Sequence, residues 1–127
     1  MKAGDTFLVA SPETTYDSHL WIVINDPNVN GDCVIVNFTS WRQDKDQACV
    51  LELGDHPYIR RKTCVNYKDA KHMDQTKLDT LVASKGLKRH DPVSQPLLQR
   101  IREGVYESRM ELRIVEVLEA EGVISLD

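Results

Sequence analysis

The sequence predicts a mainly β protein of the α+β class, a small antiparallel barrel with one or two helices at its C-terminus. Three short apolar runs, separated by turn residues, fill residues 6–39, and the clearest helical periodicity begins only at residue 94. A chain that places its strands first and its helices last favours an antiparallel sheet over alternating βαβ units. Its 127 residues are enough for one core without a metal or disulfide.

The N-terminal strands are marked by apolar runs and by the breaks between them. A first strand is predicted at residues 6–10, and the polar segment 11–18 is predicted to be a loop. Residues 20–25 are continuously apolar, which is typical of a strand buried on both faces. Residues 26–32 contain an Asn-Gly pair among other turn formers, so they predict a hairpin whose second arm is residues 33–39.

The middle of the chain predicts further strands and one short helix. Apolar, β-branched and aromatic residues indicate strands at 48–53 and 63–67, and a final short strand is expected at 86–90. Asp74 has a suitable side chain for a helix N-cap, and leucines spaced by three residues follow it. A short helix is therefore expected over residues 74–81.

Two apolar stripes predict the C-terminal helices. The first helix begins at Ser94, whose hydroxyl can cap backbone N–H groups, and Pro96 is tolerated in its first turn. The stripes consist of Leu97, Leu98, Ile101 and Val105, then Met110, Ile114, Val115 and Leu118. We therefore predict a barrel domain with its closing helix at residues 1–106, followed by an acidic helical extension at 107–127.

The charge distribution limits the function classes. Sixteen basic and 20 acidic residues give a net charge of −4, which argues against a non-specific binder of duplex DNA. Positive charge nevertheless concentrates in the middle of the chain, at Arg60, Arg61, Lys62, Lys68, Lys71, Lys85, Lys88 and Arg89. This asymmetry allows an anionic ligand on the body of the protein.

Apolar runs and cysteines indicate the cellular location. No run approaches the ~20 apolar residues that a membrane helix needs, and the first residues lack the apolar region of a secretory signal. A cytoplasmic protein without membrane association is expected. Cys33, Cys49 and Cys64 are odd in number and form no C-x-x-C pair, so we expect reduced, mostly buried thiols.

Asp55-His56-Pro57 is the most suggestive local cluster for catalysis. A loop histidine beside a carboxylate can move a proton near neutral pH, and Arg60 and Arg61 follow closely enough to hold phosphate oxygens. The alternative interpretation is a Gly-Asp turn with a partly buried histidine made rigid by the proline.

Strand ends supply a second group of candidates. His19 immediately precedes the second predicted strand, at a rim where barrels often bind ligands, although it can equally be a loop-bonded strand residue. Thr39 and Ser40 end the third strand, and Trp41 follows them. Two hydroxyls and an aromatic ring can bind and stack a nucleotide, or they can cap the strand end and pack as a lid.

Several of these features together resemble the PemK/MazF/Kid family of toxin ribonucleases. The resemblance covers roughly residues 3–106 by element order. It rests on Gly4-Asp5, the strand at 20–25, Thr39-Ser40, the segment 65–74 and the helix from Ser94 to Val105. The family's arginine before the proline of strand two is replaced here by His19-Leu20, and Lys71 best matches its later arginine.

The resemblance implies a specific fold and activity. It implies an SH3-like barrel that forms a homodimer and cleaves single-stranded RNA without a metal or other cofactor, through attack of the ribose 2′-OH. It also implies a small antitoxin-like protein as partner. Under this hypothesis the catalytic residues are His56 or His19 with Arg60. Substrate is bound by Thr39, Ser40, Trp41, Arg61 and Lys71.

Two alternatives of other classes stand beside the ribonuclease. The first is a non-catalytic SH3-like module that binds a protein partner through its groove or its acidic tail. The second is a metal-dependent hydrolase that uses the scattered residues His19, His56, His72 and His90.

Overall fold

The computed structural model describes residues 1–9, 19–28, 30–84 and 87–126 of the chain. The predicted loop at 11–18 and the last residue of the predicted first strand lie outside these residues. In the part that is described, no helix is long and apolar enough to span a bilayer.

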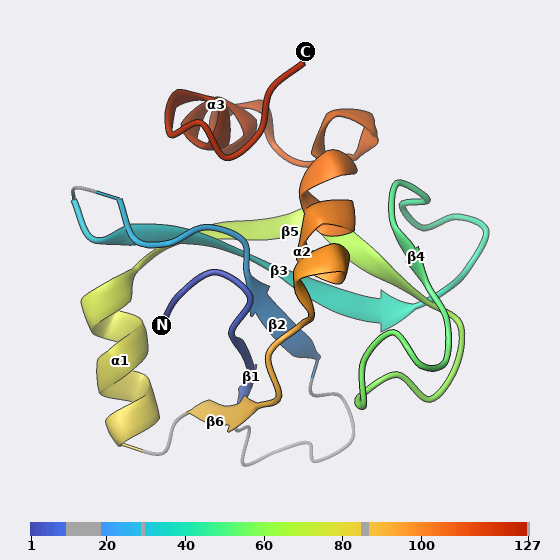
Figure 1. Cartoon of the computed structure of the whole chain (residues 1–127), viewed down its shortest axis with the longest axis horizontal. Coiled ribbons are helices and arrows are strands. Elements are labelled where there is room, and N and C mark those ends of the chain that lie inside the picture. Colours follow the sequence, from blue (N-terminus) through green and yellow to red (C-terminus); the bar gives the residue numbers. More distant parts are fainter. Residues whose placement is uncertain (10–18, 29, 85–86, 127) are drawn as a thin grey trace.

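One six-stranded antiparallel sheet forms the centre of the molecule (Figure 1). Its strands, in chain order, are β1 (Thr6–Val9), β2 (Leu20–Val23), β3 (Asp32–Ser40), β4 (Val50–Leu51), β5 (Thr63–Asp74) and β6 (Leu87–His90). Their order across the sheet is β4-β5-β3-β2-β1-β6. The α+β class and the antiparallel sheet are therefore confirmed.

Three α-helices and a short 3₁₀ helix complete the fold, mostly after the sheet. They are α1 (Gln75–Ala83), α2 (Gln95–Glu103), η1 (Val105–Glu107) and α3 (Leu112–Ala120). The two predicted N-caps are confirmed, because the Asp74 side chain accepts from Lys77 N and the Ser94 side chain accepts from Leu97 N.

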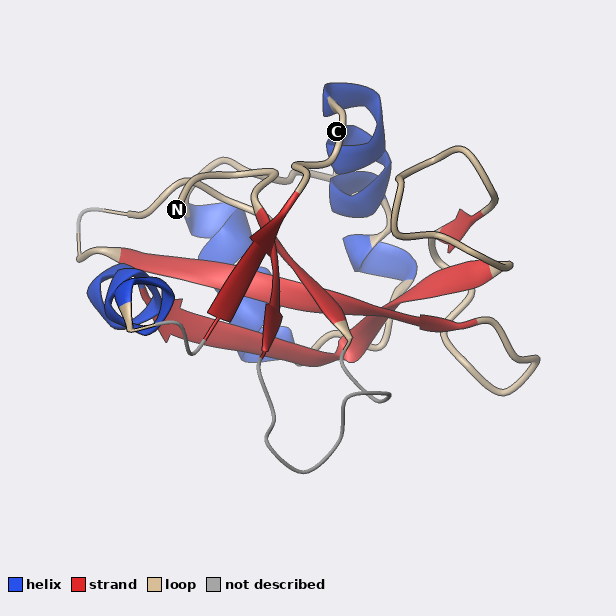
Figure 2. Ribbon diagram, turned by 90° about the horizontal axis from the view of Figure 1, so that it is seen from below, coloured by secondary structure: helices blue, strands red, loops and turns tan. Residues whose placement is uncertain are grey.

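The predicted closed barrel is wrong in one respect, since the described strands form an open sheet. The strand order ends at β4 on one side and at β6 on the other, and these two edges are not paired. Figure 2 shows the strong twist, with the short strands fanning out across the long β3 and β5 strands. A two-residue β4 and a four-residue β6 offer little backbone with which to close the barrel.

The β3–β5 ladder is longer and less regular than the sequence suggested. The strand predicted at 63–67 continues to Asp74. Between Ile35 and Asn37 the register shifts, because Ile35 pairs with Lys71 whereas Asn37 pairs with Asn66. A bulge of this kind bends the strand and increases its twist. Tyr67 lies at this irregularity and is buried in the core, where its hydroxyl donates to Ile101 O at 2.7 Å.

Each face of the sheet buries its own cluster of side chains. The main core lies under α2 and α3, where the predicted stripes of both helices meet Ile22, Val34 and Val36. A smaller cluster on the other face joins Leu78 of α1 to Phe7, Val23, Cys33, Ile35 and Leu87. The alternation of Val34 and Val36 with Cys33 and Ile35 follows from the two-residue period of a strand. The apolar stripe of α3 thus belongs to the same core as the sheet.

Candidate functional site

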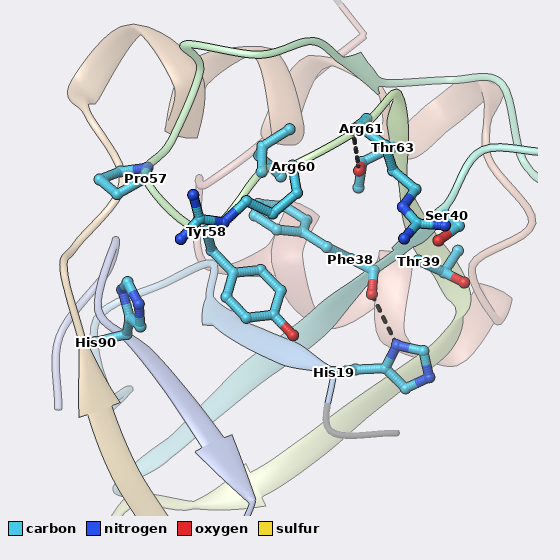
Figure 3. Close-up of a pocket in the computed structure, with 11 residues that line it drawn as sticks. His19, Phe38, Thr39, Ser40, Pro57, Tyr58, Arg60, Arg61, Thr63 and His90 are labelled. Carbon is cyan, nitrogen blue, oxygen red and sulfur yellow. Dashed lines mark hydrogen bonds between the residues drawn. The ribbon is translucent and has the colours of Figure 1, made fainter. Parts of the chain in front are cut away.

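A pocket of about 550 Å³ lies where β3 ends, between the loop after β4 and the end of β6. Figure 3 shows its residues, which come from four separate parts of the chain. They are His19, Phe38, Thr39, Ser40, Pro57, Tyr58, Ile59, Arg60, Arg61, Thr63 and His90. The pocket therefore brings together five of the eight predicted site residues: His19, Thr39, Ser40, Arg60 and Arg61.

The charge of this pocket is opposite in sign to that of the whole chain. Its lining contains two arginines and two histidines, and none of the described lining residues is acidic. Arg60 and Arg61 are exposed, and neither guanidinium is ion-paired to a described residue. In a chain of net charge −4, such a concentration of cationic donors in the described lining favours an anionic ligand with phosphate or carboxylate oxygens.

His19 is held by one hydrogen bond that determines its tautomer. It directly precedes β2, and its Nδ1 lies 3.0 Å from Phe38 O on the neighbouring β3. Because a carbonyl oxygen only accepts, Nδ1 must carry the proton, and in the neutral ring Nε2 then has a lone pair. His19 is exposed, so this arrangement can accept a proton from a ligand in the pocket.

His56 lies behind the pocket, and both nitrogens of its ring form hydrogen bonds with backbone groups. Its side chain is 4% exposed. Nε2 donates to Asp91 O at 2.7 Å, and Nδ1 accepts from Tyr58 N at 3.0 Å. This ring ties the arginine-bearing loop to the segment after β6. The structure therefore places His56 as an anchor of the loop, in line with the second of the two sequence interpretations.

A second set of bonds fixes the start of the same loop. Asp55 Oδ2 accepts from Glu52 N at 2.8 Å, and Asp55 Oδ1 lies 3.3 Å from Arg100 Nη1 of α2. Arg100 also donates to Val50 O at 2.7 Å. Both ends of the turn that leads to Arg60 are consequently tied to the body of the protein.

The sequence reasoning did not place His90 or Tyr58 in the site. His90 ends β6, and its Nδ1 accepts from Asp91 N at 2.8 Å. The ring centroids of His90 and Tyr58 are 5.8 Å apart, nearly perpendicular. Burial raises the pKa of the Tyr58 phenol, so its hydroxyl stays protonated at neutral pH. In the sequence, Tyr58 is only an aromatic residue near a predicted turn, and His90 is only a histidine at the end of a predicted strand.

Trp41 and Lys71, the two remaining predicted binding residues, do not line the pocket. The Trp41 indole donates to Gln47 Oε1 at 2.7 Å, and Lys62 Nζ lies 4.2 Å from its ring centroid. Trp41 is thus beside the pocket, next to Ser40. Lys71 pairs with Ile35, four residues along β3 from Thr39, which corresponds to roughly 13 Å of strand.

The cysteines are poorly suited to nucleophilic chemistry. All three are free and buried, as the sequence predicted. Burial raises the pKa of the Cys33 thiol to about 11, and it also raises the pKa values of Cys49 and Cys64. Thiols in this state are protonated at neutral pH and are weak nucleophiles.

Neither metal geometry nor comparison with known proteins adds a further assignment. Across residues 1–9, 19–28, 30–84 and 87–126, no three His, Cys, Asp or Glu side chains are grouped as metal ligands would be. No protein-family model matches the sequence, and no curated protein shows significant similarity to it. The pocket is therefore the feature of this protein that points to a function.

Proposed function

We propose that this protein is a PemK/MazF-like endoribonuclease that cleaves single-stranded RNA without a metal ion. The observation that carries the proposal is a pocket with no acidic residue in its described lining, where an exposed histidine with an accepting Nε2 shares the site with two arginines that form no ion pair with a described residue. These are the groups that transfer of a phosphoryl group to a neighbouring hydroxyl requires, namely a base and cationic donors for the phosphate oxygens.

In the proposed reaction, His19 acts as the base. Its Nε2 takes the proton from a ribose 2′-OH, and the 2′-oxygen attacks the adjacent phosphorus. The bond between phosphorus and the 5′-oxygen of the next nucleotide breaks, and that oxygen takes a proton from solvent. The products are a 2′,3′-cyclic phosphate and a 5′-hydroxyl. The Nδ1–H bond to Phe38 O keeps the His19 ring oriented throughout.

Arg61 is assigned to the reacting phosphate. Figure 3 shows its guanidinium beside Ser40, on the side of the pocket where Thr39 and His19 also lie. A guanidinium can donate two parallel hydrogen bonds to the non-bridging oxygens, where negative charge increases as the 2′-oxygen attacks. The hydroxyls of Thr39 and Ser40 are placed to orient the ribose or the phosphate.

A single strand suits this pocket better than a duplex. The net charge of −4 disfavours binding along a duplex backbone. A ring such as Tyr58 can stack on a base only when that base is unpaired and turned out of a helix. The homodimer and the antitoxin-like partner remain predictions from the family resemblance.

Cleavage of a labelled single-stranded RNA in EDTA tests the proposal. His19→Asn keeps a donor near the position of Nδ1 and removes the proton acceptor. We expect it to lower kcat by about 10²-fold or more. His72→Asn is the matched control, because His72 is an exposed histidine on β5 outside the pocket, beside Asp32. The control should cleave within about twofold of the wild type.

The chemistry of the products makes the test specific. RNA that carries 2′-O-methyl groups must resist the enzyme, and the cleaved fragment must carry a cyclic phosphate that mass spectrometry can identify. Full activity of His19→Asn, or cleavage of the methylated RNA, would refute the mechanism. Binding of RNA with no cleavage by a folded protein would instead support the non-catalytic module.

A further inference from the structure

The two neighbouring arginines of the pocket serve opposite ends of it. Arg60 and Arg61 are consecutive in the loop, yet Figure 3 shows their guanidinium groups pointing apart. Arg61 extends toward Ser40, whereas Arg60 extends across Tyr58 toward the side where His90 lies. A ligand that carries only one phosphate would leave one of these guanidiniums unused.

The end near Arg60 has a second donor. The Nδ1 atom of His90 accepts the Asp91 N–H bond, so the proton of the neutral ring is on Nε2. His90 lines the pocket and is held by the edge contact with Tyr58. Arg60 and His90 together therefore offer N–H groups and no acceptor, which suits an anion. At the other end, His19 offers a lone pair instead.

The backbone that carries the two ends is held in place by hydrogen bonds. Arg60 and Arg61 are carried by a loop that His56 and Asp55 tie down, and His90 belongs to a strand paired with β1. His19 is bonded to β3. Because the backbone is held at both ends, the donors of the two ends start from fixed and separate positions and can reach two anionic groups of one ligand.

We propose that the pocket binds two consecutive phosphates of one strand. Arg61 holds the phosphate that reacts, and Arg60 with His90 holds its neighbour. Tyr58, which lies between these ends in Figure 3, provides a ring for the nucleoside that joins them. The assignment of the reacting phosphate rests on the proposed function, whereas the presence of two phosphate positions does not.

Binding of short deoxyribonucleotides tests this inference without any cleavage. The probes are a thymidine dinucleotide, with one phosphate, and a thymidine trinucleotide, with two; neither has a 2′-OH. Their affinities are measured at low salt by NMR titration, with the ring signals of His19 and His90 as reporters. The wild type should bind the trinucleotide about fivefold more tightly than the dinucleotide, and the trinucleotide should shift both histidine signals.

Arg60→Gln separates the two positions. This variant should bind the dinucleotide within about twofold of the wild type but lose most of the preference for the trinucleotide. In the same variant the trinucleotide should shift the His19 signal alone. Lys68→Gln is the control, because Lys68 is an exposed cation of β5 that does not line the pocket. It should retain the full preference.

The outcomes distinguish this inference from the proposed ribonuclease. Equal affinity of the wild type for both probes, or an unchanged preference in Arg60→Gln, would overturn the two-phosphate arrangement even if RNA is cleaved. A preference that depends on Arg60 would support it even if no RNA is cleaved, and only the ribonuclease assignment would then fail.

Discussion

Three histidines meet near this pocket, and the backbone groups around them assign each a different role. His19 donates from Nδ1 to a carbonyl and has an accepting Nε2, whereas His90 accepts at Nδ1 from a backbone N–H. His56 does both at once, so neither of its nitrogens is available to a substrate. The capacity for proton transfer therefore depends on hydrogen-bond partners that the residue type alone does not reveal.

His56 should contribute mainly to stability. His56→Ala removes the bonds of the ring to Asp91 O and Tyr58 N and empties a buried site, although Asp91 O keeps the Thr6 hydroxyl as a donor. We therefore expect a loss of about 2–4 kcal/mol in the free energy of unfolding. His56→Gln should recover part of this loss, because its amide can still donate to Asp91 O. Urea denaturation of the three proteins measures both effects.

The contrary result for His56 is also informative. If His56→Ala keeps the wild-type stability but loses RNA cleavage, then this residue itself moves a proton and the sequence-based assignment is right. If His56→Ala is destabilised while the fraction that stays folded binds oligonucleotides weakly, His56 acts by positioning the arginine loop.

At the scale of elements, short sequence patterns correctly predicted the features that depend on interactions between nearby residues. The helix caps at Asp74 and Ser94 could be predicted because each side chain accepts a hydrogen bond from a backbone N–H three residues away. His19 and the Thr39-Ser40 pair were predicted separately from strand ends, and they meet because β2 begins beside the end of the antiparallel β3. Each of these features depends on a short stretch of sequence.

The sequence could not predict which strands pair when they are distant in the chain. His90 joins the pocket because β6 pairs with β1, and its partner Thr6 is distant in the chain. Lys71 lies away from the pocket because β5 continues to Asp74 and pairs Lys71 with Ile35, far along β3 from Thr39. The open sheet likewise follows from the short edge strands β4 and β6, whose lengths are decided by tertiary contacts.

The end of α2 is a sensitive junction between elements. Gly104 caps this helix, and a Cβ placed there would lie 2.5 Å from the Tyr67 hydroxyl and 3.1 Å from Ala48 O. That hydroxyl cannot move away easily, because it is buried and bonded to Ile101 O. Gly104→Ala should therefore cost about 1–3 kcal/mol of unfolding free energy, measured by thermal or urea denaturation, although alanine normally favours a helix.

A double-mutant cycle identifies the cause at Gly104. Tyr67→Phe removes the closest oxygen, so Gly104→Ala should cost less in that background than in the wild type. Equal costs in the two backgrounds would show that the clash with the hydroxyl is not what destabilises the variant.

At the scale of the whole molecule, the α3 segment shares its core with the sheet. Met110, Ile114, Val115, Leu118 and Ile124 all belong to the cluster that contains the central strands. Fully burying an apolar side chain contributes about 1.5–3 kcal/mol, and a domain is stable by only about 5–15 kcal/mol in total. Loss of this segment would thus remove a large fraction of the stability of the protein.

Two leucines of α3 test whether residues 107–127 are a detachable extension or a part of the core. Leu118 is fully buried, whereas Leu112 on the same helix is 68% exposed. We expect Leu118→Ala to lower the unfolding free energy by about 2–5 kcal/mol and Leu112→Ala to change it by less than about 0.5 kcal/mol. Equal, small effects would mean that α3 docks only weakly and that its apolar stripe is available to a partner. A large difference, together with unfolding of a chain that ends at residue 106, would mean that the pocket depends on the whole chain for its stability.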